Sequence, residues 1–400
     1  MAVTARVEHV GSLLRPPYLL EARAARDGGR LDPRAFKAVE DQAVREVLAL
    51  QQEAGCPVVT DGELRRDSFQ SELAAAVDGF AGVDMDAWLW GEWHSDAEGP
   101  GDLTVERPGA LGVVAPLRAR RRLAAEEFTF VRGVVGDDPD RVAKVTLPSP
   151  SLFANLWSPA EHAGERSDAV HGRPAKPAEH ASERQDAYPT LDSFLADVVG
   201  ILQDEVRELV RLGCTYIQLD APHYPLLIDP KWRAFYEARG WPLERWLSYG
   251  IELDNAVIDA GRPATFGFHL CRGNQRSRWL VAGGYDAIAG PVFGGVRADR
   301  LLLEYDDERS GSFDPLRLVP DDKHVVLGLV TTKTPRVETV AELERRLEAA
   351  SRWIDVDRMA ISPQCGFATS YLGNAISIDD ERRKLAVLVR TAEQFFGQVQ

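Results

Sequence analysis

Cysteine is scarce in this sequence. Its 400 residues contain four cysteines, Cys56, Cys214, Cys271 and Cys365. Disulfide-stabilised scaffolds are small, secreted and dense in cysteine, so this wide spacing excludes that class of protein. We therefore expect reduced thiols, some of which are available to bind a metal ion.

Long apolar runs are absent as well. A helix that crosses a membrane needs roughly 18 or more consecutive apolar residues, and no segment of the sequence provides them. Arg6, Glu8 and Arg15 interrupt the N-terminal region, which therefore has no signal-peptide core. These absences predict a cytoplasmic protein without a membrane partner.

The sequence also lacks an excess of positive charge. It has 47 basic and 62 acidic residues, a formal net charge of -15, and no dense run of lysine and arginine. This negative charge repels a phosphate backbone, so we expect no nucleic-acid partner.

The hydrophobic content is sufficient for a large core. With 44% hydrophobic residues the chain can bury such a core either as one large α/β barrel or as two ordinary domains.

Eight short apolar segments have the composition of buried strands. Most are separated by amphipathic stretches that predict helices, including 33–54, 191–212, 243–260 and 340–353. Strands and helices that alternate in this way predict one (β/α)8 barrel of the TIM type, formed by residues 1–400 as a single domain. The expected strands are 7–12, 57–63, 142–150, 215–220, 264–271, 301–304, 325–333 and 359–366.

Polar residues stand at the C-terminal ends of these expected strands. Barrel enzymes carry their chemistry at that end, in the loops that follow the strands. We therefore expect one candidate active site at this mouth of the barrel. The strand-end residues are Ser12, Glu63, Ser149, Asp220, His269, Cys271, Glu304, Lys333 and Cys365.

Two segments fall outside the strand-helix repeat. Residues of about 83–135 include Trp88, Trp90 and Trp93 with many glycines and prolines, which predicts an inserted hairpin or lid over the barrel. Residues of about 158–188 are polar and predict a surface loop. The sequence leaves the oligomeric state open.

The expected strand 264–271 carries a His-x-Cys pair. Successive side chains of a strand point to opposite faces, so His269 and Cys271 point the same way. Imidazole nitrogen and thiolate sulfur are usual ligands of zinc. Buried cysteine is also common without a metal, so the interpretation depends on further ligands from other strand ends.

Glu304 and Cys365 are candidates for these further ligands, because each follows an expected strand at the same mouth. The alternatives are a solvated carboxylate in the acidic stretch 304–308 and a buried structural thiol. Cys56 and Cys214 precede strands, so we expect them to be core thiols. The pattern predicts one Zn2+ ion held by Glu304, Cys365 and the His-x-Cys pair.

Several motifs, in order along the chain, resemble the cobalamin-independent methionine synthase family. The resemblance is to its catalytic C-terminal barrel and to the short bacterial members that consist of that barrel alone, and it covers most of the chain. The matching segments are 9–16 (HVGSLLRP), 61–63 (DGE), 216–220 (YIQLD), 269–271 (HLC), 303–304 (LE), 327–330 (LGLV), 335–338 (PRVE) and 363–366 (PQCG).

This resemblance implies zinc-dependent transfer of a methyl group from a methyl-folate-type donor to a small-molecule thiol. Homocysteine is the expected acceptor, which would make the reaction a step of methionine biosynthesis. The family's zinc ligands fall on the set already named, His269, Cys271, Glu304 and Cys365.

The resemblance also implies that Ser12, Glu63 and Asp220 hold the amino acid part of homocysteine. Carboxylates suit an ammonium group, and a hydroxyl with backbone N–H groups suits a carboxylate. The alternative is that Glu63 and Asp220 pair structurally with one of three arginines, Arg65, Arg66 or Arg272.

The chain departs from the family pattern in two respects. It has no additional N-terminal barrel, which helps full-length members hold the folate tail, so the identity of the methyl donor stays open. Lys333 stands where many members have a catalytic histidine, so the expected proton donor is Lys333 or a water held by Asp61.

Trp157 follows the expected strand 142–150 and has two interpretations. It is either a platform for a pterin ring of the donor or a core aromatic.

Two other functions are compatible with a zinc site. A relative could transfer a thiol such as coenzyme M to an epoxide, but that reaction needs a sulfonate site, whereas the Glu63 and Asp220 pair favours an amino acid. A zinc hydrolase usually keeps three protein ligands and an open water position. The expected four ligands, two of them thiolates, disfavour hydrolysis.

Overall fold

The computed structural model of the protein describes residues 3–81, 91–96, 99–105, 112–136, 138–157, 188–238, 240–397 and 399. Within these residues the largest element is a seven-stranded parallel sheet in the order β1-β6-β7-β8-β9-β10-β11. The strands are β1 (Val58–Val59), β6 (Val142–Pro148), β7 (Tyr216–Asp220), β8 (Thr265–Leu270), β9 (Arg300–Glu304), β10 (His324–Val330) and β11 (Met359–Pro363).

A segment near the N-terminus lies between the first and last strands of this sheet. Val7 forms a parallel bridge with Ile361 of β11, and the Glu8 N–H donates to the Ile361 carbonyl at 3.1 Å. On its other side the Leu13 N–H donates to the carbonyl of Gly62, just beyond β1, at 3.0 Å. The segment thereby closes the curled sheet into the predicted barrel.

The expectation of a regular strand at 7–12 is wrong, because an isolated bridge at Val7 replaces it. Side chains bind carbonyl groups that a strand would offer to its neighbours. Lys144 Nζ donates to the His9 carbonyl, and Thr60 Oγ1 donates to the Gly11 carbonyl at 2.7 Å. Tertiary hydrogen bonds therefore override the local strand preference.

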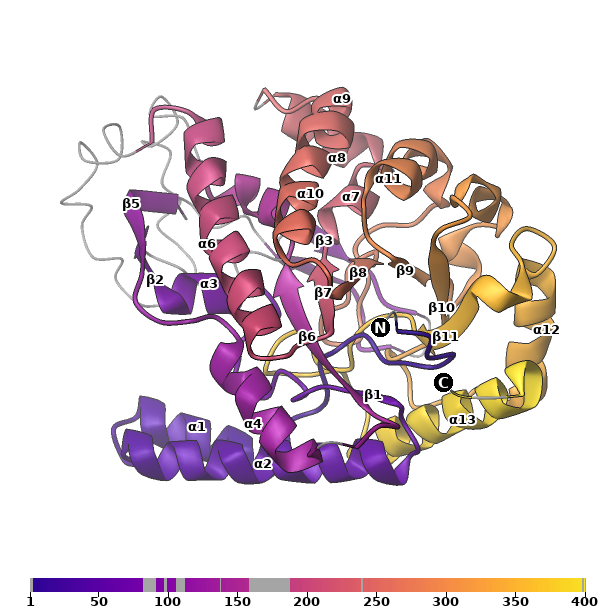
Figure 1. Ribbon diagram of the computed structural model, residues 1–400, viewed down its shortest axis with the longest axis horizontal. Helices are drawn as coiled ribbons and strands as arrows, with labels where there is room; N and C mark the ends of the chain where they lie inside the picture. Colours follow the sequence, from indigo (N-terminus) through magenta and orange to yellow (C-terminus); the bar gives the residue numbers. More distant parts are fainter. Residues whose placement is uncertain are drawn as a thin grey trace.

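Helices surround the outer face of the sheet (Figure 1). Capping boxes begin α6, α12 and α13, which explains why these helices start where they do. No helix of the described residues is long and apolar enough to cross a membrane. The principal helices are α1 (Pro17–Asp27), α2 (Pro33–Glu53), α4 (Ala125–Val135), α6 (Leu191–Arg211), α10 (Ile251–Ala260), α11 (Ala289–Gly295), α12 (Val340–Ala350) and α13 (Ile378–Phe396).

The expected helices at 33–54, 191–212 and 340–353 are confirmed to within three residues by α2, α6 and α12. The expected helix at 243–260 is present in three pieces. It comprises α9 (Leu243–Arg245), a π-helical turn (Trp246–Gly250) and α10. The π turn buries Trp246 against Trp241, with ring centroids 4.4 Å apart.

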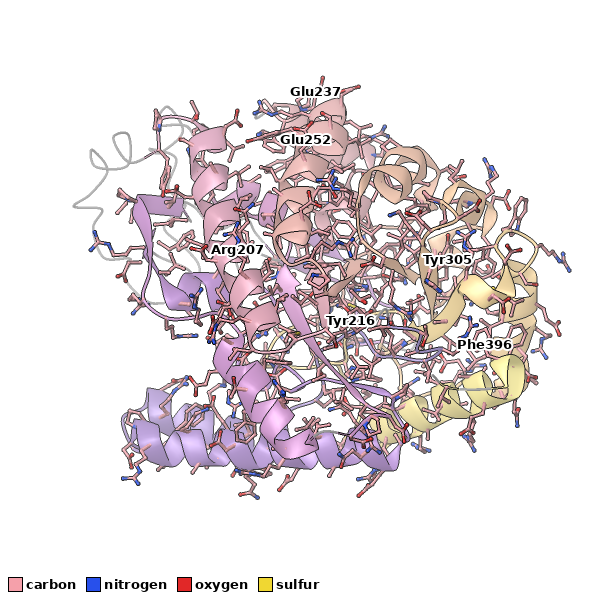
Figure 2. All side chains as sticks on the ribbon, in the orientation of Figure 1. Arg207, Tyr216, Glu237, Glu252, Tyr305 and Phe396 are labelled. Carbon is pink, nitrogen blue, oxygen red and sulfur yellow. The ribbon has the colours of Figure 1, made fainter. Side chains whose placement is uncertain are left out.

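The interior of the barrel is partly polar. Alternate residues of each strand face inward, and the parallel register pairs Lys144 with Tyr216, Thr146 with Gln218, and Pro148 with Asp220. These pairs form successive layers from the base of the barrel toward its C-terminal mouth. Figure 2 shows Tyr216 among the packed side chains of the interior, whereas Arg207 lies on an outer helix and is exposed.

Two antiparallel ladders lie outside the barrel sheet. β2 (Val77–Ala81) pairs with β5 (Gly112–Ala119), and β3 (Gly91–Trp93) pairs with β4 (Leu103–Val105). His94 continues from β3 and bridges to Trp279, in the loop that follows β8. The described part of the expected insertion at 83–135 therefore contains a hairpin attached to a strand-end loop.

Other parts of the expected insertions lie outside the described residues. These include Trp88 and Trp90 and nearly all of the expected loop at 158–188, of which Tyr188 is described. The division of the chain into one domain with two insertions stays a prediction.

Candidate metal centre and active site

Three potential metal ligands meet at the C-terminal mouth of the barrel. His269 is the fifth residue of β8, Cys271 directly follows that strand, and Cys365 lies two residues beyond the end of β11. Their ligand atoms all lie within 4.8 Å of one another, and all three residues are buried. β9 and β10 separate β8 from β11 in the sheet, so the curvature of the barrel brings these ends together.

The chemistry of this cluster fits a metal ion. Both ring nitrogens of His269 are buried, and the one partner of the ring among the described residues is the thiol of Cys271, in the same cluster. Buried polar atoms are nearly always hydrogen-bonded, so an imidazole whose partner is a thiol of the cluster is suited to coordination. One imidazole and two sulfurs form a donor set that zinc prefers.

The two thiols of the cluster differ in acidity. A hydrogen bond from Cys365 lowers the pKa of Cys271 well below its usual value, and nearby His269 lowers it further, against the opposing effect of burial. Metal ions bind the thiolate form of cysteine. Cys271 is therefore already biased toward the form that binds a metal.

Glu304 lies at the end of β9, beside β8, but outside the three-residue cluster. Its Oε2 accepts a hydrogen bond from the backbone N–H of Arg272 at 2.6 Å, and its Oε1 accepts one from Arg309 at 2.9 Å. Burial raises the pKa of Glu304 although Arg309 opposes this. The carboxylate is thus bound to the residue that follows Cys271.

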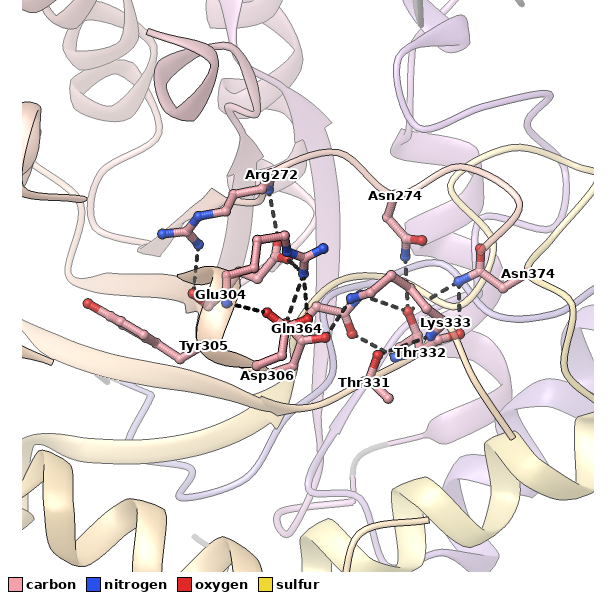
Figure 3. A network of polar contacts seen from close by, with 12 residues as sticks. Arg272, Asn274, Glu304, Tyr305, Asp306, Thr331, Thr332, Lys333, Gln364 and Asn374 are labelled. Carbon is pink, nitrogen blue, oxygen red and sulfur yellow. Dashed lines mark hydrogen bonds and ion pairs between the residues drawn. The ribbon is translucent and has the colours of Figure 1, made fainter. Parts of the chain in front are cut away.

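A network of hydrogen bonds centred on Thr332 fixes the loops that carry the two thiols (Figure 3). Asn274 Nδ2 donates to Thr332 Oγ1 at 2.9 Å and to the carbonyl of Gly366, next to Cys365, at 2.8 Å. The Thr332 N–H donates to Gln364 Oε1 at 2.7 Å. Asn274 follows Cys271 by three residues, so the network ties both cysteine-bearing loops together.

Glu63 and Asp220, the predicted ammonium-binding carboxylates, are buried at the same mouth. Glu63 Oε1 accepts a hydrogen bond from Thr146 Oγ1 at 2.6 Å, whereas Glu63 Oε2 is buried without a partner. Asp220 Oδ1 accepts a hydrogen bond from Gln218 Nε2 at 2.7 Å. One oxygen of Glu63 thus lacks a partner, as expected of a group that binds a ligand.

The Glu63 carboxylate affects the acidity of Asp220. Burial raises the pKa of Asp220, His269 opposes this increase and Glu63 adds to it, so that the pKa is about 7. A cation bound between the two groups would favour their charged forms and reverse this increase. The pair therefore has the electrostatic character of a site for a small cation.

The alternative pairing with arginine is partly present. Arg66 Nη1 lies 3.9 Å from Glu63 Oε1, at the limit of an ion pair, and its Nη2 donates to Glu127 at 3.0 Å. Arg65 binds Asp41, and Arg272 contacts neither predicted carboxylate through a hydrogen bond. Arg66 thus gives Glu63 a distant counter-charge.

Ser12 lies directly beside the loop that carries Cys365. Its carbonyl accepts a hydrogen bond from the Phe367 N–H at 2.9 Å. A Cβ atom added at Gly366 would lie 1.9 Å from the Ser12 Oγ, so only glycine fits beside this hydroxyl.

Trp157 is half-buried at the end of the 3-10 segment that follows β6, and its indole N–H donates to the Tyr188 carbonyl at 3.3 Å. It also packs against the main hydrophobic core.

The two predicted proton donors have different surroundings. Lys333 is buried, and its ammonium group forms an ion pair with Asp306, which is itself bound by Arg309, the partner of Glu304. Asp61 Oδ1 accepts a hydrogen bond from the Glu63 N–H at 3.0 Å. Asp61 also lines a small cavity with Arg66 and Glu127, next to α4. Lys333 therefore belongs to the network around Glu304, and Asp61 supports the backbone of Glu63.

Several residues of the site were not predicted as functional. Arg272, Arg309 and Asp306 surround Glu304 and Lys333, and Asn274 and Thr332 fix the cysteine loops. Arg272 and Asn274 flank Cys271 closely in sequence, and this proximity is a signal that could have identified them. For Arg309 and Asp306 the signal is their place in the acidic loop that follows Glu304.

Comparison with known proteins adds a family match. A family model described as "Cobalamin-independent synthase, Catalytic domain" matches residues 180–393. An uncharacterized protein, YxjH of Bacillus subtilis, is 30% identical over 390 residues, which cover 97% of this chain and 93% of the relative. A methionine synthase of Pyrococcus abyssi is 25% identical over 358 residues, with coverage of 89% and 84%.

A solved structure has the same fold. It belongs to a Listeria monocytogenes protein assigned to the vitamin-B12-independent methionine synthases, and it covers 100% of both chains with a TM-score of 0.70 and 23% identity. The similarity confirms the predicted barrel architecture.

Proposed function

The chain belongs to the family of cobalamin-independent synthase catalytic domains, and from this membership we propose that it transfers a methyl group to the thiol of homocysteine, forming methionine. The observation that carries the proposal is the buried cluster of His269, Cys271 and Cys365 at the mouth of the barrel. A thiol acceptor is the substrate that such a cluster suits best, since a soft metal site binds sulfur.

We assign zinc to this cluster, with Glu304 as the fourth ligand. A zinc ion there would lower the pKa of a substrate thiol, so that the nucleophilic thiolate forms near neutral pH. For Glu304 to take part, one of its oxygens would have to exchange its hydrogen bond with Arg272 or Arg309.

The remaining residues bind and orient the acceptor in this proposal. Glu63 and Asp220 hold the ammonium group, and the buried Glu63 Oε2 supplies an acceptor without a protein partner. The Ser12 hydroxyl contributes to the binding of the acceptor's carboxylate. Because these groups stand on strand ends, the amino acid part is fixed while the thiol is directed toward the cysteine loops.

The methyl donor must be a molecule whose leaving group accepts a proton, and a methyl-folate is the proposed class. Trp157 offers an aromatic surface for its pterin ring. Lys333 is the preferred proton donor, because its ammonium group is buried in the network around Glu304, whereas Asp61 accepts a hydrogen bond from the Glu63 N–H and lines a separate small cavity. Proton donation in this way contributes typically 10²- to 10⁴-fold to a rate.

The proposal is tested by mixing zinc-loaded protein with L-homocysteine and measuring methionine. Methyltetrahydrofolate with one and with three glutamates and methylcobalamin are offered as donors in separate reactions. We expect methionine with a folate donor and none with the Cys271→Ser variant. Absence of methionine with every donor, in protein that contains zinc, would contradict the assigned acceptor or donor class.

A further inference from the structure

A chain of hydrogen bonds runs through the barrel interior from its base to Asp220. Lys144 Nζ donates to Glu8 Oε2 at 2.8 Å, to the His9 carbonyl, and to Gln218 Oε1 at 2.7 Å. Gln218 Nε2 then donates to Asp220 Oδ1 at 2.7 Å. Lys144 and Gln218 are buried, and both lie on strands of the rigid sheet.

The orientation of the Gln218 amide follows from its partners. An ammonium group has three hydrogens to donate and cannot accept, and Lys144 has three acceptors around it. The atom of Gln218 that faces Lys144 must therefore be the oxygen. Its NH2 group is consequently directed at Asp220, which must accept.

The base of this chain is itself anchored. Glu8 receives hydrogen bonds from Arg300 Nε at 3.0 Å and from the Tyr216 hydroxyl at 2.9 Å, in addition to the one from Lys144. Arg300 also donates to two backbone carbonyls of the N-terminal segment, those of Val3 and Ala5. Glu8 is thus fixed by Arg300 and Tyr216 and in turn fixes the Lys144 ammonium group. A different conformation of Lys144 would leave Glu8 with fewer hydrogen-bond donors.

The neighbouring carboxylate is supported by an equivalent contact. Thr146 donates to Glu63 Oε1, and Thr146 is the register partner of Gln218 on the adjacent strand. One layer of the barrel therefore supplies one donor to each predicted ammonium-binding carboxylate. Among the described residues Gln218 provides the single side-chain hydrogen bond to Asp220.

We propose that Gln218, oriented by Lys144, is a positioning residue that holds Asp220 in the geometry needed to bind the ammonium group of the acceptor. This inference rests on the proposed function, in which Asp220 binds that group. Gln218 does not touch the acceptor and acts through Asp220. It therefore affects recognition of the amino group and leaves the thiol and the metal cluster unaffected.

The test compares two thiols that differ in the amino group. L-homocysteine carries it, and 4-mercaptobutyrate is the same molecule without it. Dissociation constants of both are measured by titration calorimetry for zinc-loaded wild-type protein and for the Gln218→Leu, Asp220→Asn and double variants, with zinc content determined for each. Gln203→Leu is the matched control, because it removes an amide hydrogen bond to the Ala256 carbonyl on the outer helices.

We expect Gln218→Leu to raise the Kd of L-homocysteine roughly tenfold, since an unsupported buried hydrogen-bonding group is costly. The Kd of 4-mercaptobutyrate and the zinc content should stay unchanged. In the Asp220→Asn background the same change should have less than about a twofold effect, because residues that act as one unit are not additive. Gln203→Leu should alter neither Kd.

Equal weakening of both thiols, or full additivity with Asp220→Asn, would overturn the inference and show a merely structural role. If Asp220→Asn weakens homocysteine but Gln218→Leu does not, the inference fails while the proposed function stands. If Asp220→Asn has no effect, the ammonium site itself is wrong and the inference falls with it. Should Gln218→Leu not fold, Gln218→Asn keeps the amide but shortens its reach and provides the same comparison.

Discussion

Asp220 and His269 are register partners on the adjacent parallel strands β7 and β8. Neighbouring strands lie about 4.8 Å apart, so a proposed ammonium-binding residue and a proposed metal ligand are held at a fixed separation by backbone hydrogen bonds. In the proposed function the acceptor spans the distance between these two residues. The length of the thiol would then be part of what the site recognises, because the backbone hydrogen bonds of the sheet hold the two residues at this separation.

The cysteines provide a direct test of the metal site. Cys271→Ser and Cys365→Ser should each reduce bound zinc far below about one ion per chain, since a hydroxyl is a poor substitute for thiolate on zinc. Metal content is measured by plasma mass spectrometry after dialysis. Cys56→Ser and Cys214→Ser alter buried thiols elsewhere and should keep the metal. Full zinc content in both site variants would refute the assignment.

The predicted ammonium site is tested by removing charge without changing shape. Glu63→Gln and Asp220→Asn should each weaken homocysteine binding by roughly 2 kcal/mol or more, since each leaves a buried charge of the ligand with fewer partners. The measurement is the KM for homocysteine alongside zinc content, which should not change. An unaltered KM in both variants would show that the amino group is bound elsewhere.

Lys333 is tested by a substitution that keeps its charge. Arginine can preserve the ion pair with Asp306 but is a far weaker acid. If Lys333 supplies the proton, Lys333→Arg should lower kcat roughly 10²-fold with little change in KM. Lys323→Arg, at a buried lysine that binds the Ala298 carbonyl, is the control. An unchanged kcat in Lys333→Arg would show that Lys333 forms the ion pair with Asp306 but does not donate the proton.

Glu381 should make stability depend on pH. It lies on α13, accepts a hydrogen bond from the Leu14 N–H at 2.8 Å, and burial raises its pKa from 4.5 to about 8. The folded state therefore holds the proton more tightly than the unfolded state, so this contribution to stability falls as pH rises from about 4.5 to 8. The free energy of unfolding of Glu381→Gln, measured by chemical denaturation, should decline less over this pH range than that of the wild type. An identical decline in both proteins would contradict the raised pKa of Glu381.

Lys144 should be important for stability as well as for orientation. Lys144→Met removes one of the cations that neutralise the buried Glu8, and breaking a buried ion pair costs about 3 kcal/mol or more. Lys231→Met removes an exposed pair with Glu92 and should cost less than about 1 kcal/mol. Urea denaturation of the two variants measures the contrast. Equal stability losses would mean that Arg300 and the Tyr216 hydroxyl satisfy Glu8 without Lys144.

Much of the barrel could be predicted because its strands are short apolar runs with polar ends. The run that ends in His269 and Cys271 was expected at 264–271 and forms β8 at Thr265–Leu270. The segment at 7–12 could not be assigned correctly from local sequence. Its carbonyls are bound by Lys144 and Thr60, which lie far away in the chain and are brought near by folding.

The candidate site was likewise predictable in part, in its metal ligands but not in the contacts that support them. Residue type and position at strand ends indicated His269, Cys271 and Cys365, because period-two alternation and the barrel pattern define where such residues converge. The supporting contacts could not be inferred. Arg309 beside Glu304 and Gln218 beneath Asp220 depend on side-chain conformations in the packed interior, which no sequence period encodes.

The separation of the ligands along the chain has a consequence for biosynthesis. His269 and Cys271 are synthesised well before Cys365, and the sheet gains β11 after every other strand has been made. An ion captured by the nascent polypeptide would find two of the three clustered donors. The complete cluster exists once the last strand has docked beside β10, so a metal ion that needs all three donors would bind after β11 has been made.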